Sequence, residues 1–248
     1  RHNLVPDSAL SFCTIMDYLG MCLTKRTHPL VHVSNAASFG FFDVQKKCFE
    51  MDWLNKIRMD TIRLPEICED MEVLGMYKDI PVTVAIGDNQ ASFLGAAGSE
   101  NNTLLVNMGT GGQISVLTDQ YFETEGIEAR PFLGGKYLLV GASLCGGKAY
   151  ALLENFFRSF MKEATGQDIP LYEILGRLAE KGMDASSSSM KVQTTFDGTR
   201  TDSGLRGEIR NISSDNFTPE FLTYGVLEGM IREFYDMFVQ IEKGTEIK

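Results

Sequence analysis

The stretch "VAIGDNQASFLGAAGSENNTLLVNMGTGGQISVL", Val84 to Leu117, contains two apolar runs with different endings. The first ends on Asp88 and the second on the glycine-rich turn 109–112. Residues 82–86 predict a buried strand, and the composition of residues 90–97 predicts a helix directly after it. Ligands of open α/β sheets bind beyond the carboxyl ends of strands. A carboxylate and a glycine turn therefore stand at positions suited to a ligand.

Two interpretations of Asp88 follow from its position between a strand and a helix. An anionic aspartate there can accept the proton of a hydroxyl group and so activate its oxygen. It can also help to bind Mg²⁺. Aspartate is equally a favoured N-cap of the helix that it precedes, and the local sequence alone favours this structural role. The two roles are compatible in one residue.

The turn "NMGTGG" suits an anion but does not demand one. Gly109, Gly111 and Gly112 permit positive φ and close approach of the backbone. Exposed N–H groups in such a turn form an anion site, to which Thr110 adds a hydroxyl donor. The alternative is a plain hairpin turn. Neither a Walker A loop nor a dinucleotide fingerprint fits, since no Gly-Lys-Ser/Thr follows and the next element is a strand. Together, a carboxylate and a phosphate cradle match the needs of phosphoryl transfer.

The composition is that of a soluble globular protein and excludes some partners. The 248 residues suit one large domain or two modest ones, with 44% hydrophobic and 23% charged residues. The net charge of -10 argues against free nucleic acid as a partner. Five cysteines without a CxxC pair indicate a reducing compartment. With no signal peptide or membrane-length apolar run, we expect a cytoplasmic protein.

Helices and strands are mixed along the chain, which predicts the α/β class, with a domain boundary near residues 98–102. Further helices are expected at 8–23, 148–165 and 217–241, and further strands at 103–109, 112–118 and 136–144. The serine-rich run 184–190 predicts an exposed loop. The Phe and Met side chains of the two long helices, Phe156 and Phe160 among them, are expected in the core.

Two other groups of polar residues give weak signals. His2, His28 and His32 lack the helix and glutamate of a zinc protease motif, so metal binding is disfavoured. The run "GTRTDSGLRGEIR" concentrates three arginines. It could bind phosphate, but a solvated loop with salt bridges to nearby acids is favoured. The three arginines are Arg200, Arg206 and Arg210.

Five segments in order resemble the FGGY carbohydrate kinases. The opening stretch is similar to the centre of that family, and "HVSNAASFGFFDVQKKCFEMDWL" is similar to its upstream segment. Downstream follow "LLVGASLCGGKAYALLENFF", "FDGTRTDSGLRGEIRNIS" and "NFTPEFLTYGVLEGMIREFYDMF". The resemblance runs from about Asp17 to the end of the chain. The stretches "NAAS", "ASLCGG" and "RNISSDNFT" look closest to the sedoheptulokinase branch.

The resemblance implies a fold, a reaction and its reactants. The expected fold is the actin-like, sugar-kinase and Hsp70 ATPase (ribonuclease H-like) fold, present as two partial domains. Residues 1–98 would be the C-terminal part of the sugar-binding domain, and residues 99–248 the first part of the nucleotide-binding domain. The implied reaction is ATP-dependent phosphorylation of a sugar hydroxyl with Mg²⁺, on a ketose such as sedoheptulose. The expected partners are a sugar and ATP, without nucleic acid or membrane, and a homodimer is possible.

The resemblance also assigns roles residue by residue. Asp88 matches the catalytic base, and a role as Mg²⁺ ligand is carried with it. Asn89 matches the neighbouring position that faces the sugar. Five positions match glycine-rich nucleotide contacts of the family, namely Gly109, Thr110 and Gly111 in the turn and Gly146 and Gly147 at a helix start.

Departures from the family pattern leave two alternatives open. The sequence lacks the family's N-terminal Asp-x-Gly-Thr hairpin and its C-terminal Gly-Gly-rich adenosine segment, so it resembles the middle of a kinase. A catalytically incompetent fragment is the expected state of the 248-residue chain alone. A non-catalytic binding or interaction member of the same fold is the other alternative. Gln113 stands where some relatives have an aromatic residue. His32 and Val33 replace a polar pair common in glycerol and xylulose kinases, which argues against those substrates.

Overall fold

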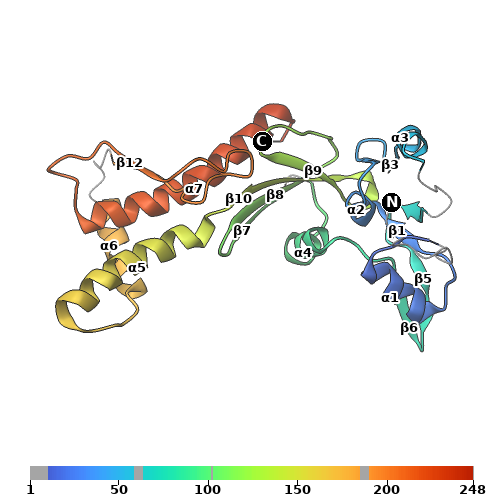
Figure 1. The fold of residues 1–248 in the computed structure, drawn as a ribbon, viewed down its shortest axis with the longest axis horizontal. Coiled ribbons are helices and arrows are strands. Elements are labelled where there is room, and N and C mark those ends of the chain that lie inside the picture. The colour runs from blue at the N-terminus through green and yellow to red at the C-terminus, as the bar shows by residue number, and fades with distance from the viewer. Residues whose placement is uncertain (1–10, 59–63, 102, 185–189, 248) are drawn as a thin grey trace. The chain divides into compact units, whose positions relative to one another are not determined.

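The computed structural model describes residues 11–58, 64–101, 103–184 and 190–247 (Figure 1). Its helices are α1 (Ile15–Thr24), α2 (Val33–Ala36), α3 (Met51–Lys56), α4 (Asp88–Ala97), α5 (Gly146–Thr165), α6 (Tyr172–Asp184), α7 (Pro219–Gly244) and the 3₁₀ turn η2 (Leu133–Gly135). Its strands are β1 (Leu30–His32), β2 (Phe42–Asp43), β3 (Cys48–Phe49), β4 (Glu66–Cys68), β5 (Val73–Tyr77), β6 (Ile80–Thr83), β7 (Leu104–Met108), β8 (Gly112–Thr118), β9 (Ile127–Pro131), β10 (Tyr137–Ser143), β11 (Lys191–Gln193) and β12 (Glu208–Arg210).

The described strands form one four-stranded sheet and several two-stranded pairs. The larger sheet has the order β7-β8-β10-β9. Strand β1 pairs in parallel with β4, while β2–β3, β5–β6 and β11–β12 are antiparallel. The chain divides into two compact units. Unit 1 consists of residues 1–103, 116–122 and 129–139, and unit 2 of residues 104–115, 123–128 and 140–248.

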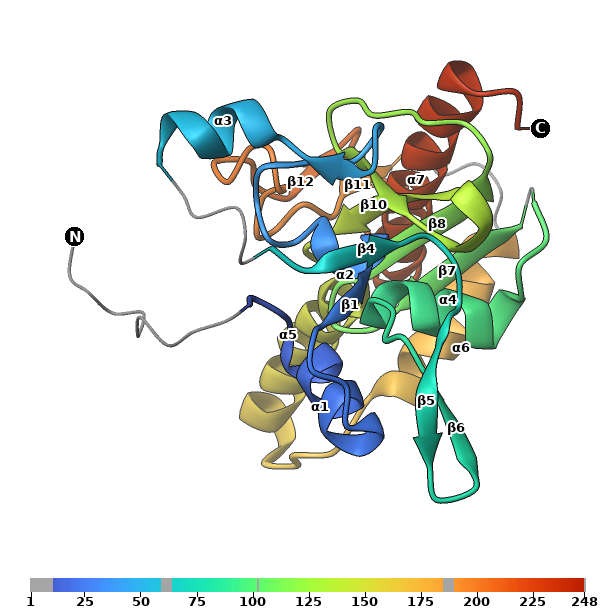
Figure 2. The same cartoon turned by 90° about the vertical axis from the view of Figure 1, so that its right-hand side faces the viewer.

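Unit 1 builds its core around short buried elements. Helix α1 begins with a capping box, in which the Thr14 hydroxyl accepts the Asp17 N–H and the Asp17 carboxylate accepts the Thr14 N–H. All residues of β1 and α2 are buried, although the run includes polar side chains. The β5–β6 hairpin lies beside α1 (Figure 2). Two groups of buried side chains result, one around Leu30, Cys68, Leu74 and Val84 and one around Val31, Ala36, Phe49 and Leu54.

Unit 2 is organised by three helices and strand β11. Helix α6 packs along α7, and both α5 and β11 also contact α7 (Figure 1). Helix α7 starts with Thr218 at its N-cap and Pro219 directly after it, as the sequence predicts. The core of this unit joins buried residues of α5, β11 and α7, namely Cys145, Ala149, Leu153, Met190, Val192, Val226 and Met230.

Most predicted elements are confirmed. The strands expected at 103–109, 112–118 and 136–144 are β7, β8 and β10, and the long helices are α5 and α7. The helix expected at 90–97 is α4. The helix expected from residue 8 starts at Ile15 among the described residues. The predicted loop 184–190 falls almost entirely outside the described residues.

Two predictions from apolar patterns are wrong. The buried strand expected at 82–86 is instead β6, which ends at Thr83 and is largely exposed because it pairs only within the β5–β6 hairpin. On α5, Phe156 and Phe160 are 63% and 72% exposed rather than in the core. The side chains of α5 that pack on the core are those of Ala149, Leu153 and Phe157, whereas Leu152, Phe156 and Phe160 follow an adjacent stripe of the helix, which is exposed.

Candidate functional site

Asp88 is the first residue of α4, and its carboxylate is exposed to solvent. Gly87 occupies the N-cap position, with no side-chain cap, so the N-cap role considered for Asp88 falls to its neighbour. The Asn89 N–H donates to Asp88 Oδ1 at 2.6 Å. The structure therefore presents an anionic oxygen at the start of a helix.

A single carboxylate of this kind suits Mg²⁺ in one respect. Magnesium in phosphoryl-transfer sites is bound through one or two carboxylates, substrate phosphates and water. Within the described ranges, no group of three or more His, Cys, Asp or Glu side chains is arranged to hold a metal ion. Asp88 thus fits a shared Mg²⁺ site and not an all-protein cage.

Buried side chains of α2 hold the backbone just before Asp88. The Gly87 N–H donates to Ser34 Oγ at 2.9 Å, and Asn35 Nδ2 donates to the carbonyl of Ala85 at 3.0 Å. The two side chains are buried, since Ser34 is 7% and Asn35 4% exposed, and the backbone of Ala85 and Gly87 is half-buried. The turn before α4 is therefore fixed by residues that lie 50 and 53 positions earlier in the chain.

The turn is also fixed from its other side. Gln90 is 4% exposed, and its Nε2 donates to the carbonyl of Pro131 at 3.0 Å. A Cβ atom on Gly87 would lie 2.4 Å from Gln90 Oε1, so this position has to be glycine for Gln90 to pack as it does.

His32 completes the buried polar group behind the turn. It is fully buried, its Nδ1 lies 2.7 Å from Ser34 Oγ, and its Nε2 lies 3.0 Å from the carbonyl of Glu69. Burial lowers the pKa of His32, against the opposing influence of the Glu69 hydrogen bond and the nearby acids Asp70, Glu69 and Asp17. The imidazole is therefore neutral at physiological pH.

The glycine turn between β7 and β8 packs directly against the start of α5. The N–H groups of Gly147 and Lys148 donate to the carbonyls of Gly109 and Thr110 at 2.8 and 3.1 Å. We call residues 109–111 the glycine bend. Two N–H groups of the first turn of α5 thus bind the bend, and not an external ligand.

Glycines on both sides make this contact possible. A Cβ atom on Gly146 would lie 2.4 Å from the carbonyl oxygen of Gly111, and one on Gly147 would lie 2.6 Å from that of Gly109. A Cβ on Gly111 would lie 2.9 Å from the carbonyl oxygen of Ser143. The structure gives these glycines a packing role, and their contact with a nucleotide stays a prediction. Thr110, by contrast, is exposed at the tip of the bend.

A charged pair lies at the same helix start. Lys148 Nζ is 2.7 Å from the carboxylate of Asp197, and this hydrogen bond raises the pKa of Lys148. Asp88 and Asn89 belong to unit 1, whereas the bend, Gly146 and Gly147 belong to unit 2. The structure thus describes the two predicted halves of the site separately, and their joint action stays a prediction.

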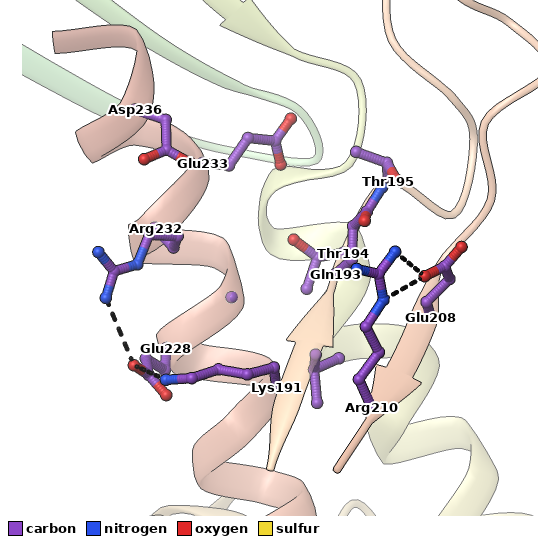
Figure 3. A pocket seen from close by; sticks show the side chains of 12 residues that line it. Lys191, Gln193, Thr194, Thr195, Glu208, Arg210, Glu228, Arg232, Glu233 and Asp236 are labelled. Atoms are coloured by element: carbon purple, nitrogen blue, oxygen red, sulfur yellow. Dashed lines mark hydrogen bonds and ion pairs between the residues drawn. The ribbon is translucent and has the colours of Figure 1, made fainter. Parts of the chain in front are cut away.

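A cavity of about 350 Å³ in unit 2 is lined by polar residues, and neither Asp88 nor the glycine bend is among them. Figure 3 shows Lys191 and Arg232 paired with Glu228 on one side, and Arg210 paired with Glu208 on the other. Arg210 belongs to the arginine-rich segment 198–210, and the other two arginines of that segment also have partners. Arg200 pairs with Glu128, and Arg206 donates to the carbonyls of Ser203 and Leu205. The expectation that this arginine-rich loop makes salt bridges to nearby acids is confirmed for Arg200 and Arg210.

Sequence analysis missed the residues that support Asp88. Ser34 and Asn35 were named only as part of the stretch "HVSNAASFGFFDVQKKCFEMDWL", which resembles the FGGY carbohydrate kinases. The available signal was the occurrence of adjacent polar residues inside an apolar run, since buried polar groups need partners. Their partners are distant in sequence, so no local pattern identifies them.

Comparison with known proteins finds similarity to several sugar kinases. The sequence matches no protein-family model. It is 25% identical over 239 residues to sedoheptulokinase from Homo sapiens, covering 90% of this chain and 50% of the human protein. It is 24% identical over 244 residues to xylulose kinase from Lactococcus lactis subsp. lactis, covering 92% of this chain and 46% of that protein. The chain spans about half the length of these relatives.

The fold has solved counterparts of the same kind. The crystal structure of xylulose kinase from Rhodospirillum rubrum superposes with a TM-score of 0.79, at 21% identity, over 94% of this chain and 48% of that one. The actin-like α/β fold expected from the sequence is thereby confirmed. None of the helices in the described ranges combines the length and the apolar character needed to cross a membrane.

Proposed function

We infer that this chain, a member of the FGGY carbohydrate kinase family, belongs to a protein that transfers the γ-phosphoryl group of ATP to a sugar hydroxyl. The observation that carries the proposal is the exposed carboxylate of Asp88 at the first position of α4, on a turn held by hydrogen bonds to two buried side chains. A rigidly held carboxylate is what a general base for an alcohol requires.

Asp88 is the proposed base. Its carboxylate accepts the proton of the sugar hydroxyl as the oxygen attacks the γ-phosphorus. Asn89 is the proposed neighbour that faces the sugar, as the family resemblance implies; its Oδ1 is buried and has no hydrogen-bond partner among the described residues.

The glycine bend is the proposed phosphate-binding element. Its attachment to α5 through two backbone hydrogen bonds fixes the backbone of the bend before a ligand binds; the Gly109 N–H is occupied by the Gly111 carbonyl at 2.9 Å, so the proposed backbone donors are the N–H groups of Thr110 and Gly111. The hydroxyl of Thr110 adds an exposed donor. When bound, Mg²⁺ supplies positive charge to the β- and γ-phosphates, and Asp88 is the residue of this chain that would help to hold it.

For the acceptor we propose a ketose such as sedoheptulose. Support comes from the similarity to human and mouse sedoheptulokinases over 90% of the chain. His32 and Val33 replace a polar pair of glycerol and xylulose kinases, and His32 is fully buried here and unavailable to a sugar. We place the protein in the cytoplasm with a small sugar and ATP as partners, and a homodimer remains a prediction.

A phosphoryl-transfer assay tests the proposal. The protein expressed from its complete gene is incubated with γ-³²P-ATP, Mg²⁺ and sedoheptulose, xylulose or glycerol, and labelled sugar phosphate is counted. We expect label on a ketose, with sedoheptulose preferred and little ATP hydrolysis without sugar. ATP binding without transfer to any sugar would favour a non-catalytic member of the fold. The isolated 248-residue chain serves as comparison and is expected to be inactive.

A further inference from the structure

We propose that Ser34 and His32 are positioning residues, whose buried side chains orient the turn that carries Asp88 through a chain of hydrogen bonds with one donor-to-acceptor direction. The inference rests on the proposed role of Asp88 as base and adds two residues that do not touch the substrate. The chain of bonds runs from the Gly87 amide to Ser34, then to His32, and ends on the carbonyl of Glu69.

The donor and acceptor roles along this chain of hydrogen bonds follow from the groups at its two ends. At one end a backbone N–H, that of Gly87, can only donate, so Ser34 Oγ accepts from it at 2.9 Å. At the other end the Glu69 carbonyl can only accept, so His32 Nε2 carries the proton at 3.0 Å. His32 Nδ1 is then an acceptor, and it receives the Ser34 hydroxyl at 2.7 Å and the Ser34 N–H at 3.2 Å. A neutral imidazole with its proton on Nε2 satisfies every member.

Burial makes the arrangement specific. His32 is 0% and Ser34 7% exposed, so water is largely excluded as a substitute partner. The acids that face the imidazole are Asp17, Glu69 and Asp70. Without the Ser34 hydroxyl, the Gly87 amide would lack its partner at a half-buried turn.

The chain of bonds matters for Asp88 because of how that residue is held. The Asp88 carboxylate is exposed, and its hydrogen bond goes to the adjacent Asn89 amide. Its direction is therefore set by the backbone of the turn. Ser34 holds the peptide that enters Gly87, the N-cap residue directly before Asp88. Small displacements of a base relative to its substrate reduce rates strongly.

Matched substitutions test the kinetic consequence on the protein from its complete gene. We expect Ser34→Ala to lower kcat by about 10- to 100-fold. The KM for ATP should stay unchanged, because the glycine bend belongs to unit 2. Ser34→Thr keeps the hydroxyl and should restore much of the rate. Ser38→Ala, the same change at an exposed serine of the same segment, is the control and should match the wild type.

Two substitutions of His32 separate its bonds. In His32→Asn the side-chain amide oxygen can lie near the former Nδ1 position and accept from Ser34. In His32→Gln the amide reaches only the former Nε2 position, near the Glu69 carbonyl. His32→Asn should therefore retain more activity than His32→Gln. Thermal unfolding of each variant identifies any that fails to fold, and Ser34→Thr keeps the proposal testable if Ser34→Ala does not fold.

Amide hydrogen exchange of the 248-residue chain tests the bonds without any enzyme assay. Gly87 should exchange at least about 10-fold faster in Ser34→Ala than in the wild type, and Ser38→Ala should not differ. Unchanged exchange at Gly87 would overturn the chain of bonds. Faster exchange with unchanged kcat would overturn the positioning role. No phosphoryl transfer by the wild type would overturn the proposed function, and with it any catalytic role of the pair, whatever the exchange rate shows.

Discussion

The contact between the glycine bend and α5 makes Gly146→Ala a decisive substitution. Gly146 is the buried first residue of α5. A Cβ atom there would lie 2.4 Å from the oxygen and 2.5 Å from the carbon of the Gly111 carbonyl, and 2.7 Å from the Gly112 nitrogen. All three are backbone atoms, and the bend is tied to the helix by two hydrogen bonds. The added methyl group cannot be accommodated by rotation of a side chain.

The expected cost is the balance of two opposing effects. Alanine in place of glycine favours a helix by about 1 kcal/mol. Overpacking a close contact costs about 1–3 kcal/mol. Backbone neighbours put this contact at the upper end of the range, so the net loss in the free energy of unfolding is about 2 kcal/mol.

Two alanine substitutions at other glycines serve as controls for the urea unfolding assay. Gly176→Ala in α6 meets no atom within 4 Å and should stabilise the protein by about 0.5–1 kcal/mol. Gly109→Ala meets only the Gly111 oxygen, at 3.9 Å, and should be nearly neutral. A Gly146→Ala variant as stable as Gly176→Ala would refute the packing of the bend against α5.

Two further predictions concern buried titratable groups. Burial lowers the pKa of His32, so the unfolded chain binds a proton at higher pH than the folded chain. The free energy of unfolding should therefore decrease as the pH falls below about 6.5, and urea midpoints of His32→Asn should show a weaker decrease. Burial raises the pKa of Cys68 to about 12, whereas Cys22 and Cys48 are exposed. A disulfide reagent at pH 8 should thus label Cys22 and Cys48 in the native protein and Cys68 only after unfolding; early labelling of Cys68 would contradict its burial.

Local sequence patterns predicted the positions of helices and strands better than which of their faces are buried. Alternating and 3.6-residue patterns located β7, β8, β10, α5 and α7, and the Thr218-Pro219 pair located the start of α7. On α5 the apolar pattern was only partly right, because Leu153 and Phe157 pack on the core while Phe156 and Phe160 are exposed. The sequence could not show which stripe of the helix is covered, because coverage depends on distant segments.

The candidate site was predictable in its exposed residues and not in their support. Asp88 and the glycine bend are recognisable from adjacent residues. The bonds from Ser34 to Gly87 and from Asn35 to Ala85 join positions 53 and 50 residues apart. The glycines at 146 and 147 indicated a close approach, but only the structure shows that the approaching group is the bend itself.

The role of Asp88 is tested most directly by the rate of γ-phosphoryl transfer in Asp88→Asn, measured on the protein from its complete gene with its preferred sugar. A general base contributes about 10²- to 10⁴-fold, so kcat should fall by that factor while the KM for ATP stays within about threefold. Asp79→Asn, at an exposed turn between β5 and β6, is the matched control and should leave both constants unchanged. An Asp88→Asn variant that folds and transfers phosphate at the wild-type rate would contradict the assignment of this carboxylate as the base.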